Sequence, residues 1–415
     1  MTPLLGMARL IFKTIPDLLL SGWSALLMLL AVLLVFWQYR RVAVTEAELY
    51  GIPKHSALTQ TGYSLWVGMV GGVLGSFLFA LTGIGLVDAP GAPSALLYLW
   101  PLSIGLGAFN PRFLCFAYGA TLLALSHLIT GWPHIDVPQL TGLIAIMHMV
   151  EAFLIWASGD SCATPISIDR NTAEPIPGFA LQRFWPVPLI LPWFTVVGGA
   201  PVDMPGWWPL LRPDPQLVGV AGSLNWGLLP VVVTLSYTDL AIAGAPQQRT
   251  QQSSRALLLY SGILLLLAVG ASRFPPLVWA AALFSGIGHE AMAVLAGRLQ
   301  MLGTPYLQRP PRGVGVLDVL PGSTAEAGGL RTGAVILTVD DLEVHSKAEL
   351  HDALMASPAY VRIMYRVGHQ LEHCRIPRPP EGLFSFGAIV LPESGDRPLV
   401  KLRRPSFFRR NGLEQ

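Results

Sequence analysis

Charged residues are scarce in this chain. Asp, Glu, Lys and Arg make up only 13% of its 415 residues, whereas soluble domains carry roughly 25%. Together with 52% hydrophobic residues and a mean hydropathy of +0.53, this excludes an ordinary soluble protein and predicts an integral membrane protein. The net charge is +2, with no basic stripe along the sequence, so a nucleic-acid-binding surface is not expected.

Cysteine is scarce as well. Cys115, Cys162 and Cys374 are far apart and match no CxxC spacing, so neither a disulfide framework nor a zinc knuckle is predicted. The chain also has no glycine-rich phosphate loop and no GxSxG motif. We therefore expect no cofactor.

Long apolar runs take the place of charge. About 20 apolar residues are needed to cross the hydrocarbon core of a membrane, and several windows approach that length. They predict a polytopic α-helical membrane domain over residues 1–300 with seven to nine transmembrane helices, nine being preferred. The longer windows are 17–37, 64–87, 112–131, 138–158, 216–236, 255–271 and 275–297, and the two shorter ones are 95–109 and 186–200.

Lys and Arg concentrate in alternate loops between these windows. Because basic loops stay on the cytoplasmic side, the bias predicts a multi-pass protein of the plasma membrane whose C-terminal part is cytoplasmic. The basic set consists of Arg40, Arg41, Lys54, Arg112, Arg170, Arg183, Arg249 and Arg255.

The window 64–87 carries a packing motif. Gly68, Gly71, Gly72 and Gly75 form two overlapping GxxxG pairs in a single predicted helix. Small residues allow close helix contact in lipid. The motif therefore predicts tight packing, either within the chain or at the seam of a homodimer.

After residue 300 the pattern changes to that of a small α+β domain. Capping boxes at Ser323/Glu326 and Ser346/Glu349 mark two helix starts. The expected elements are a strand at 314–319, a short helix after 323, a strand at 333–339, a helix at 348–355 and a strand at 360–365.

This order of elements, carried by VLPGSTAEAGGLRTGAVILTVDDLEV, AELHDAL and YVRIMYRVGH, resembles a PDZ domain of the bacterial HtrA-like type over residues 306–378. The resemblance implies a groove in which a peptide adds as an extra strand to an open sheet edge. Gly313 and Gly315 either present backbone amides to a carboxylate or only make the turn into the strand. The expected groove residues are Arg312, Gly313, Val314, Gly315, Val316, Leu317, Leu350 and Leu354.

The remaining segment, 379–415, is predicted to be a tail that is first Pro-rich and then basic and aromatic. Its end reads KLRRPSFFRR over residues 401–410. Such a sequence either contacts anionic lipid of the cytoplasmic leaflet or remains a soluble tail.

Ionisable residues within apolar helices are costly and are therefore functional candidates. They are His127, His148, Glu151, His289 and Glu290. His148 and Glu151 are three residues apart and share a helix face. His289-Glu290 invites comparison with the HExxH motif of site-2-type intramembrane metalloproteases, but the second histidine is replaced by Ala293.

Two interpretations of these residues follow. In the preferred one they are paired polar groups that fix helix packing, so no catalytic residue, no metal and no enzyme activity are expected. In the alternative, His289, His148 and Glu151 converge on a metal, and the protein is a degenerate or active site-2-like protease whose PDZ-like domain admits substrates.

Further sequence segments indicate the family. They are the HxxE pair at His148/Glu151, GFALQRFWPVPL from Gly178, SYTDLAIAG from Ser236, and GHE at 288–290 leading into the PDZ-like region. With these the chain resembles the MinJ-type topological determinants of cell division in Gram-positive bacteria. The resemblance implies a non-enzymatic scaffold that bridges a DivIVA-type polar protein to the Min system and so helps to place the septum.

Overall fold

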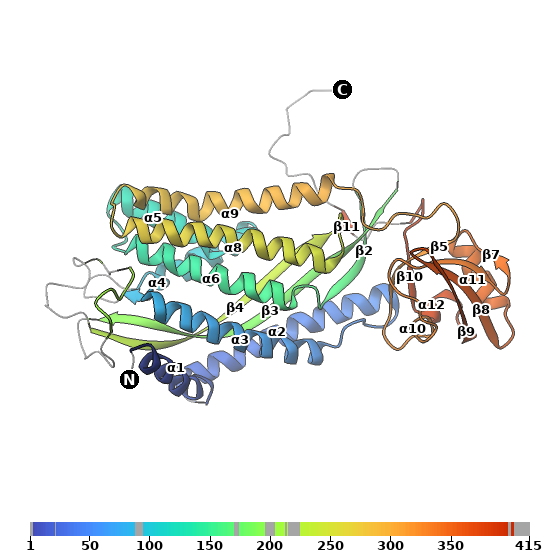
Figure 1. Cartoon of the computed structure of the whole chain (residues 1–415), viewed down its shortest axis with the longest axis horizontal. Coiled ribbons are helices and arrows are strands. Elements are labelled where there is room, and N and C mark those ends of the chain that lie inside the picture. The colour runs from blue at the N-terminus through green and yellow to red at the C-terminus, as the bar shows by residue number, and fades with distance from the viewer. Residues whose placement is uncertain are drawn as a thin grey trace, which may run out of the picture.

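A computed structural model describes residues 3–20, 22–87, 94–169, 174–195, 204–211, 214, 225–396 and 400–401. Figure 1 shows an elongated body of helices and long strands, with a small domain at one end. The helices are α1 (Pro3–Leu20), α2 (Gly22–Tyr50), α3 (Ala57–Thr82), α4 (Leu96–Phe109), η1 (Pro111–Leu114), α5 (Phe116–Thr130), α6 (Val137–Ser158), α8 (Pro246–Ala271), α9 (Leu277–Leu302), α10 (Thr324–Ala327), α11 (Lys347–Ala356) and α12 (Leu383–Phe386). The strands are β1 (Leu86–Val87), β2 (Ala163–Asp169), β3 (Ile176–Thr195), β4 (Asn225–Ala241), β5 (Val314–Val319), β6 (Val335–Val339), β7 (Leu342–Glu343), β8 (Tyr360–Val367), β9 (Gln370–Pro377), β10 (Ala388–Val390) and β11 (Val400–Lys401).

Within the described residues, the helical body contains five helices that are long and apolar enough to cross a membrane, judged by length and composition. They are α2, α3, α6, α8 and α9. The apolar helices α4 and α5 are shorter. Helix α6 lies at the centre, because most of its residues are buried and it packs against α3, α8 and α9. These helices support the predicted association with a membrane.

Two windows predicted as transmembrane helices are strands. The window 186–200 falls in β3 up to residue 195, and 216–236 falls in β4 from residue 225, the rest of both lying outside the described residues. β3 pairs antiparallel with the whole of β4, from Phe179↔Ala241 to Thr195↔Asn225. The preferred count of nine helices is therefore wrong.

The residue types of the two windows explain the strands. Pro186, Pro188 and Pro192 recur in β3, and proline in a helix interior removes a hydrogen bond and clashes with the preceding turn. β4 carries Pro230 and the β-branched run 231–234, which favours extended backbone. An apolar run by itself does not distinguish a buried strand from a helix.

The glycines of α3 pack within the chain. A Cβ on Gly68 would lie 2.3 Å from the Pro186 carbonyl oxygen, and one on Gly72 would lie 2.0 Å from that of Pro188. The glycine pair on the adjoining face, Gly71 and Gly75, meets side chains of α6. Of the two packing partners predicted for GxxxG, the structure therefore shows an intramolecular one, because only glycine lets α3 approach β3 so closely.

The C-terminal domain is built on a sheet in the order β10-β5-β6-β8-β9, with β7 paired to β6. Both predicted helix starts are capped by serine: Ser323 Oγ accepts from the Glu326 amide at 3.2 Å, and Ser346 Oγ accepts from the Glu349 amide at 3.2 Å. The two glutamates accept from the amides of Gly322 and His345, one residue before each serine. The expected α+β order of elements is confirmed from β5 to β8.

The predicted end of this domain at residue 378 is wrong. Helix α12 and strand β10 follow it, and Phe386 is fully buried in the core of the domain. β10 pairs antiparallel with β5, with Ala388 opposite Val319 and Val390 opposite Val316. The proline-rich surroundings and the short apolar run of residues 383–390 are typical of a linker, so the sequence places these residues in the tail. Residues 402–415, which include most of the predicted basic and aromatic tail sequence, lie outside the described residues.

The two parts of the molecule are in contact. Leu317 and Leu391 of the C-terminal domain belong to the same apolar cluster as the helical body. Lys54 forms an ion pair with Asp318, and its Nζ also donates to the Ala163 carbonyl at 2.9 Å. The face of β5 turned away from the core of the domain therefore rests on the end of the helical body.

Candidate functional site

The residues predicted to form the peptide groove are mostly inside the C-terminal domain. Val314, Val316, Leu350 and Leu354 are buried in its core. Gly313 and Gly315 are also buried, whereas Arg312 is exposed. Side chains in such positions stabilise the domain and are not accessible to a peptide.

Strand β5 also lacks the open edge that the predicted groove requires. One edge is paired with β6 and the other with β10, where the Leu391 amide donates to the Gly315 carbonyl at 2.8 Å. The prediction that a peptide adds to β5 is therefore wrong, since the chain's own residues 388–391 occupy that position. β10 is now the terminal strand of the sheet on this side.

Helix α11 runs beside the segment that contains β10. Near one end, the Leu383 amide donates to His351 Nδ1 at 3.3 Å, and at the other the Lys347 amide donates to Glu393 Oε1 at 2.8 Å. Phe384 is 82% exposed and Met355 is 39% exposed. The accessible apolar side chains of this region thus flank β10 and α11.

A second candidate site lies inside the helical body. Cys115 Sγ is 3.3 Å from His148 Nε2 and 3.5 Å from His289 Nε2. The three ligand-type atoms all lie within 4.8 Å of one another. They come from three elements: the junction of η1 and α5, helix α6 and helix α9. Tyr260 of α8 packs edge-on against both imidazoles.

The outer nitrogen of each imidazole has its own partner. His148 Nδ1 donates to the Ile144 carbonyl at 2.8 Å. His289 Nδ1 is 3.3 Å from the Tyr118 hydroxyl, which in turn donates to Glu290 at 2.7 Å. A neutral imidazole carries one N–H. Both Nε2 atoms therefore face Cys115 as acceptors.

The other predicted intramembrane residues lie around this cluster or apart from it. Glu290 forms an ion pair with Arg112. Glu151 is one helical turn beyond His148 on α6 and is not a member of the cluster. His127 donates from Nδ1 to the Pro133 carbonyl at 2.9 Å and is likewise not a member.

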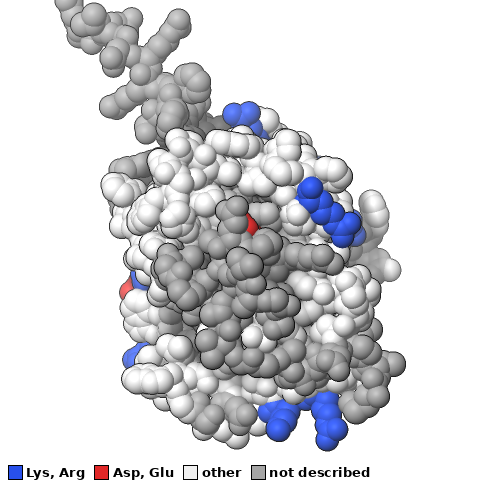
Figure 2. Space-filling view, turned by 90° about the vertical axis from the view of Figure 1, so that its left-hand side faces the viewer, with Lys and Arg blue, Asp and Glu red and all other residues white. Residues whose placement is uncertain are grey.

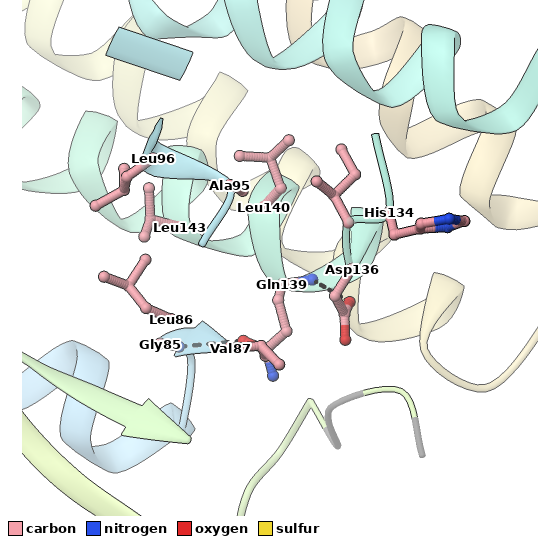
Figure 3. Close-up of a pocket in the computed structure, with 11 residues that line it drawn as sticks. Gly85, Leu86, Val87, Ala95, Leu96, His134, Asp136, Gln139, Leu140 and Leu143 are labelled. Carbon is pink, nitrogen blue, oxygen red and sulfur yellow. Dashed lines mark hydrogen bonds between the residues drawn. The ribbon is translucent and has the colours of Figure 1, made fainter. Parts of the chain in front are cut away.

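A small pocket lies at the end of the body away from the C-terminal domain. Figure 3 shows Gln139 and Asp136 among the residues that line it. Gln139 accepts from the Gly85 amide at 3.1 Å and donates to the Leu211 carbonyl at 2.7 Å, and Asp136 accepts from the Gln139 amide at 2.9 Å. Burial raises the pKa of Asp136 to about 6. Both polar side chains are hydrogen-bonded to other parts of the chain. The rest of the lining is mainly apolar.

Comparison with known proteins places this geometry in context. No family model matches the chain. It is 24% identical over 327 residues to the probable cell division topological determinant MinJ of Lacticaseibacillus paracasei, covering 76% of this chain and 80% of that protein. The protein of the same name from Lacticaseibacillus casei (strain BD-II) gives the same values. The chain resembles the MinJ-type determinants.

The resemblance predicted from the sequence is thereby confirmed. The MinJ of Bacillus subtilis (strain 168), named a cell division topological determinant, is 20% identical over 232 residues, which is 56% of this chain. The match spans about half of that protein, 54% of its length. The likeness to MinJ supports a role in cell division.

The member of the intramembrane cluster that sequence reasoning missed in this MinJ-like chain is Cys115. Its histidine partners were candidates because ionisable groups in apolar helices are costly. Cys115 matched no motif and lies 33 residues from His148 and 174 from His289. Its one signal is its position just before an apolar helix, after the Asn110–Pro111 turn.

Proposed function

We propose that the protein is a multi-pass membrane scaffold of bacterial cell division that recruits partner proteins through its C-terminal domain. The similarity to three MinJ proteins carries this proposal. The five long apolar helices supply the membrane anchor. The C-terminal domain has an apolar core of its own, as expected of a recruiting module.

The C-terminal domain faces the cytoplasm in this proposal. Basic residues lie at the end of the body that carries the domain, among them Lys54, which is paired with Asp318, and Arg249, which is paired with Asp239 at 2.7 Å. Figure 2 shows the opposite end, where the described Lys and Arg side chains are scattered and form no patch. Since basic segments remain cytoplasmic, this distribution supports the orientation.

The proposed recruiting surface is β10 with the adjoining α11. An extended segment of a division protein would add to the outer edge of β10 and place apolar side chains against Phe384 and Met355. Main-chain hydrogen bonds then supply affinity and side-chain contacts supply selectivity. The expected partners remain a DivIVA-type polar protein and Min-system proteins.

The division role can be tested in cells. A fluorescent fusion of the full chain, expressed in a Bacillus subtilis strain that lacks its own MinJ, is expected to concentrate at division sites and to reduce misplaced septa. Septum position and fluorescence are scored by microscopy. Even distribution of a stable fusion around the membrane, with septa still misplaced, would contradict the proposal.

The recruiting surface has a matched test. Phe384→Asp combined with Met355→Asp places two charges beside β10, and we expect loss of concentration at division sites with an unchanged amount of membrane-bound protein. Leu371→Asp alters another exposed apolar side chain, 59% exposed, on β9 at the far edge of the sheet. If all of these variants localise like the unmodified chain, recruitment does not use β10.

A further inference from the structure

We propose that Cys115, His148 and His289 form a zinc site that joins three elements of the helical body. The site is independent of the division role and of any enzyme activity. The sequence predicts no metal, because HExxH is incomplete at Ala293. The structure supplies a different ligand set from separate elements.

The two sulfur–nitrogen distances are close to the edges of a zinc coordination tetrahedron. Zinc binds cysteine sulfur at about 2.3 Å and histidine nitrogen at about 2.0–2.1 Å, so tetrahedral geometry places sulfur and nitrogen about 3.5–3.6 Å apart. The observed separations are 3.3 Å to His148 and 3.5 Å to His289. Both separations are within about 0.3 Å of the tetrahedral value.

One of the two imidazole Nε2 atoms lacks a hydrogen-bond donor unless a cation binds in the cluster. Both Nε2 atoms are acceptors directed at the same sulfur, and a thiol carries only one hydrogen. The Cys115 thiol can therefore satisfy either His148 or His289 but not both. One cation with empty coordination positions satisfies both nitrogens and the thiolate together.

The outer contacts are those that orient metal-binding histidines. Histidine ligands usually donate their second N–H to a carbonyl oxygen or to a carboxylate-linked group, which fixes the tautomer and the ring. His148 does so through Ile144, and His289 does so through Tyr118 and Glu290. Sulfur with two imidazoles is a donor set suited to zinc.

The position of the cluster indicates what the metal would do. α9 leads directly into the C-terminal domain, and His289 lies within α9. An ion bound also by α6 and by the start of α5 would hold α9 in one register against the body.

Zinc content is the direct test. The full chain is purified in detergent, loaded with zinc chloride, desalted and assayed by elemental analysis beside Cys115→Ala, His148→Ala and His289→Ala. We expect about one zinc per chain, with at least tenfold less in each variant. Cys162→Ala and His127→Ala are matched controls, a buried thiol and a helix histidine outside the cluster, and should retain the metal.

A second measurement uses the unmodified chain and does not depend on the folding of variants. Zinc should slow alkylation of Cys115 at least tenfold, as read by mass spectrometry of the labelled peptides, and leave Cys162 and Cys374 unchanged. No stoichiometric zinc, retention of zinc in the three variants, or equal protection of all three cysteines would overturn the site. Selective loading with copper in place of zinc would also overturn it.

Discussion

The helical body and the C-terminal domain bury different kinds of side chain. The body encloses Glu46 and Arg183 completely and His148 almost so. Glu46 accepts from the His55 amide at 2.9 Å and from Thr164 Oγ1 at 2.7 Å. In the described part of the C-terminal domain the buried polar residues are Asp318 and Ser357, and Asp318 pairs with Lys54 of the body. The core cluster of the domain consists of aliphatic and aromatic residues with one tyrosine.

This difference follows from the surroundings of each part. In water, burial of apolar surface selects the fold at roughly 25 cal/mol per Å². In lipid, apolar side chains gain little by meeting one another, so close packing and polar contacts determine which elements pair. Substitutions should thus destabilise the body most at its polar contacts and the domain most in its apolar core.

The largest effect is expected in the apolar core of the domain. Phe386→Ala should lower the free energy of unfolding by about 3–5 kcal/mol, because it leaves a large cavity. Phe384→Ala, two residues earlier and 82% exposed, is the control. Hydrogen exchange of peptides from β5 to β9 in the full chain measures the effect. Equal behaviour of the two variants would restore the domain boundary at residue 378.

A smaller effect is expected at Arg183. Its guanidinium donates to Gln60 Oε1 at 2.5 Å and to Ser64 Oγ at 2.9 Å. Arg183→Met should cost about 3 kcal/mol, since it removes two charge-assisted hydrogen bonds between β3 and α3. Arg41→Met, an exposed arginine 5.0 Å from the Trp37 ring, should cost little.

Denaturant unfolding in detergent compares these two arginine variants. If Arg41→Met destabilises the chain as much as Arg183→Met, position within the buried network does not matter. The idea that buried polar contacts stabilise the helical body would then be wrong.

The smallest effect is a pH dependence at Asp136. Burial raises its pKa from 3.8 to about 6 in the folded chain. An acid whose pKa rises on folding favours the folded state when protonated, so this contribution is present below pH about 4 and is lost as pH rises to about 6. Thermal unfolding of the full chain should show this fall. Asp136→Asn should flatten it, and an unchanged slope would exclude Asp136 as its source.

Local signals in the sequence predicted much of the C-terminal domain. Ser323 and Ser346 each cap the helix that begins at the next residue, so a short stretch of sequence is enough to locate the helix start. β10 was missed because it has only three residues and its partner strand lies about 70 positions earlier. Such pairing depends on the folded domain and leaves no periodic pattern.

For the helical body, composition predicted which segments are apolar but not how the segments are arranged. Length and hydropathy identified α2, α3, α6, α8 and α9, but the same measures misassigned β3 and β4, where Pro186 and the valines from 231 to 233 carried the better signal. His148 and His289 were recognised as candidates. Their meeting with Cys115 depends on how three elements are rotated and shifted in the bundle.

The path of the chain after β10 has a mechanical consequence. Val400 and Lys401 of β11 pair in parallel with Ile168 and Asp169 of β2, in the sheet of the helical body. The C-terminal domain is therefore fastened to the body at both ends, through α9 and through β11. A partner that pulls on the domain loads these two attachments together, so force is shared between a helix and a strand sheared along its length. Detachment then requires both to yield.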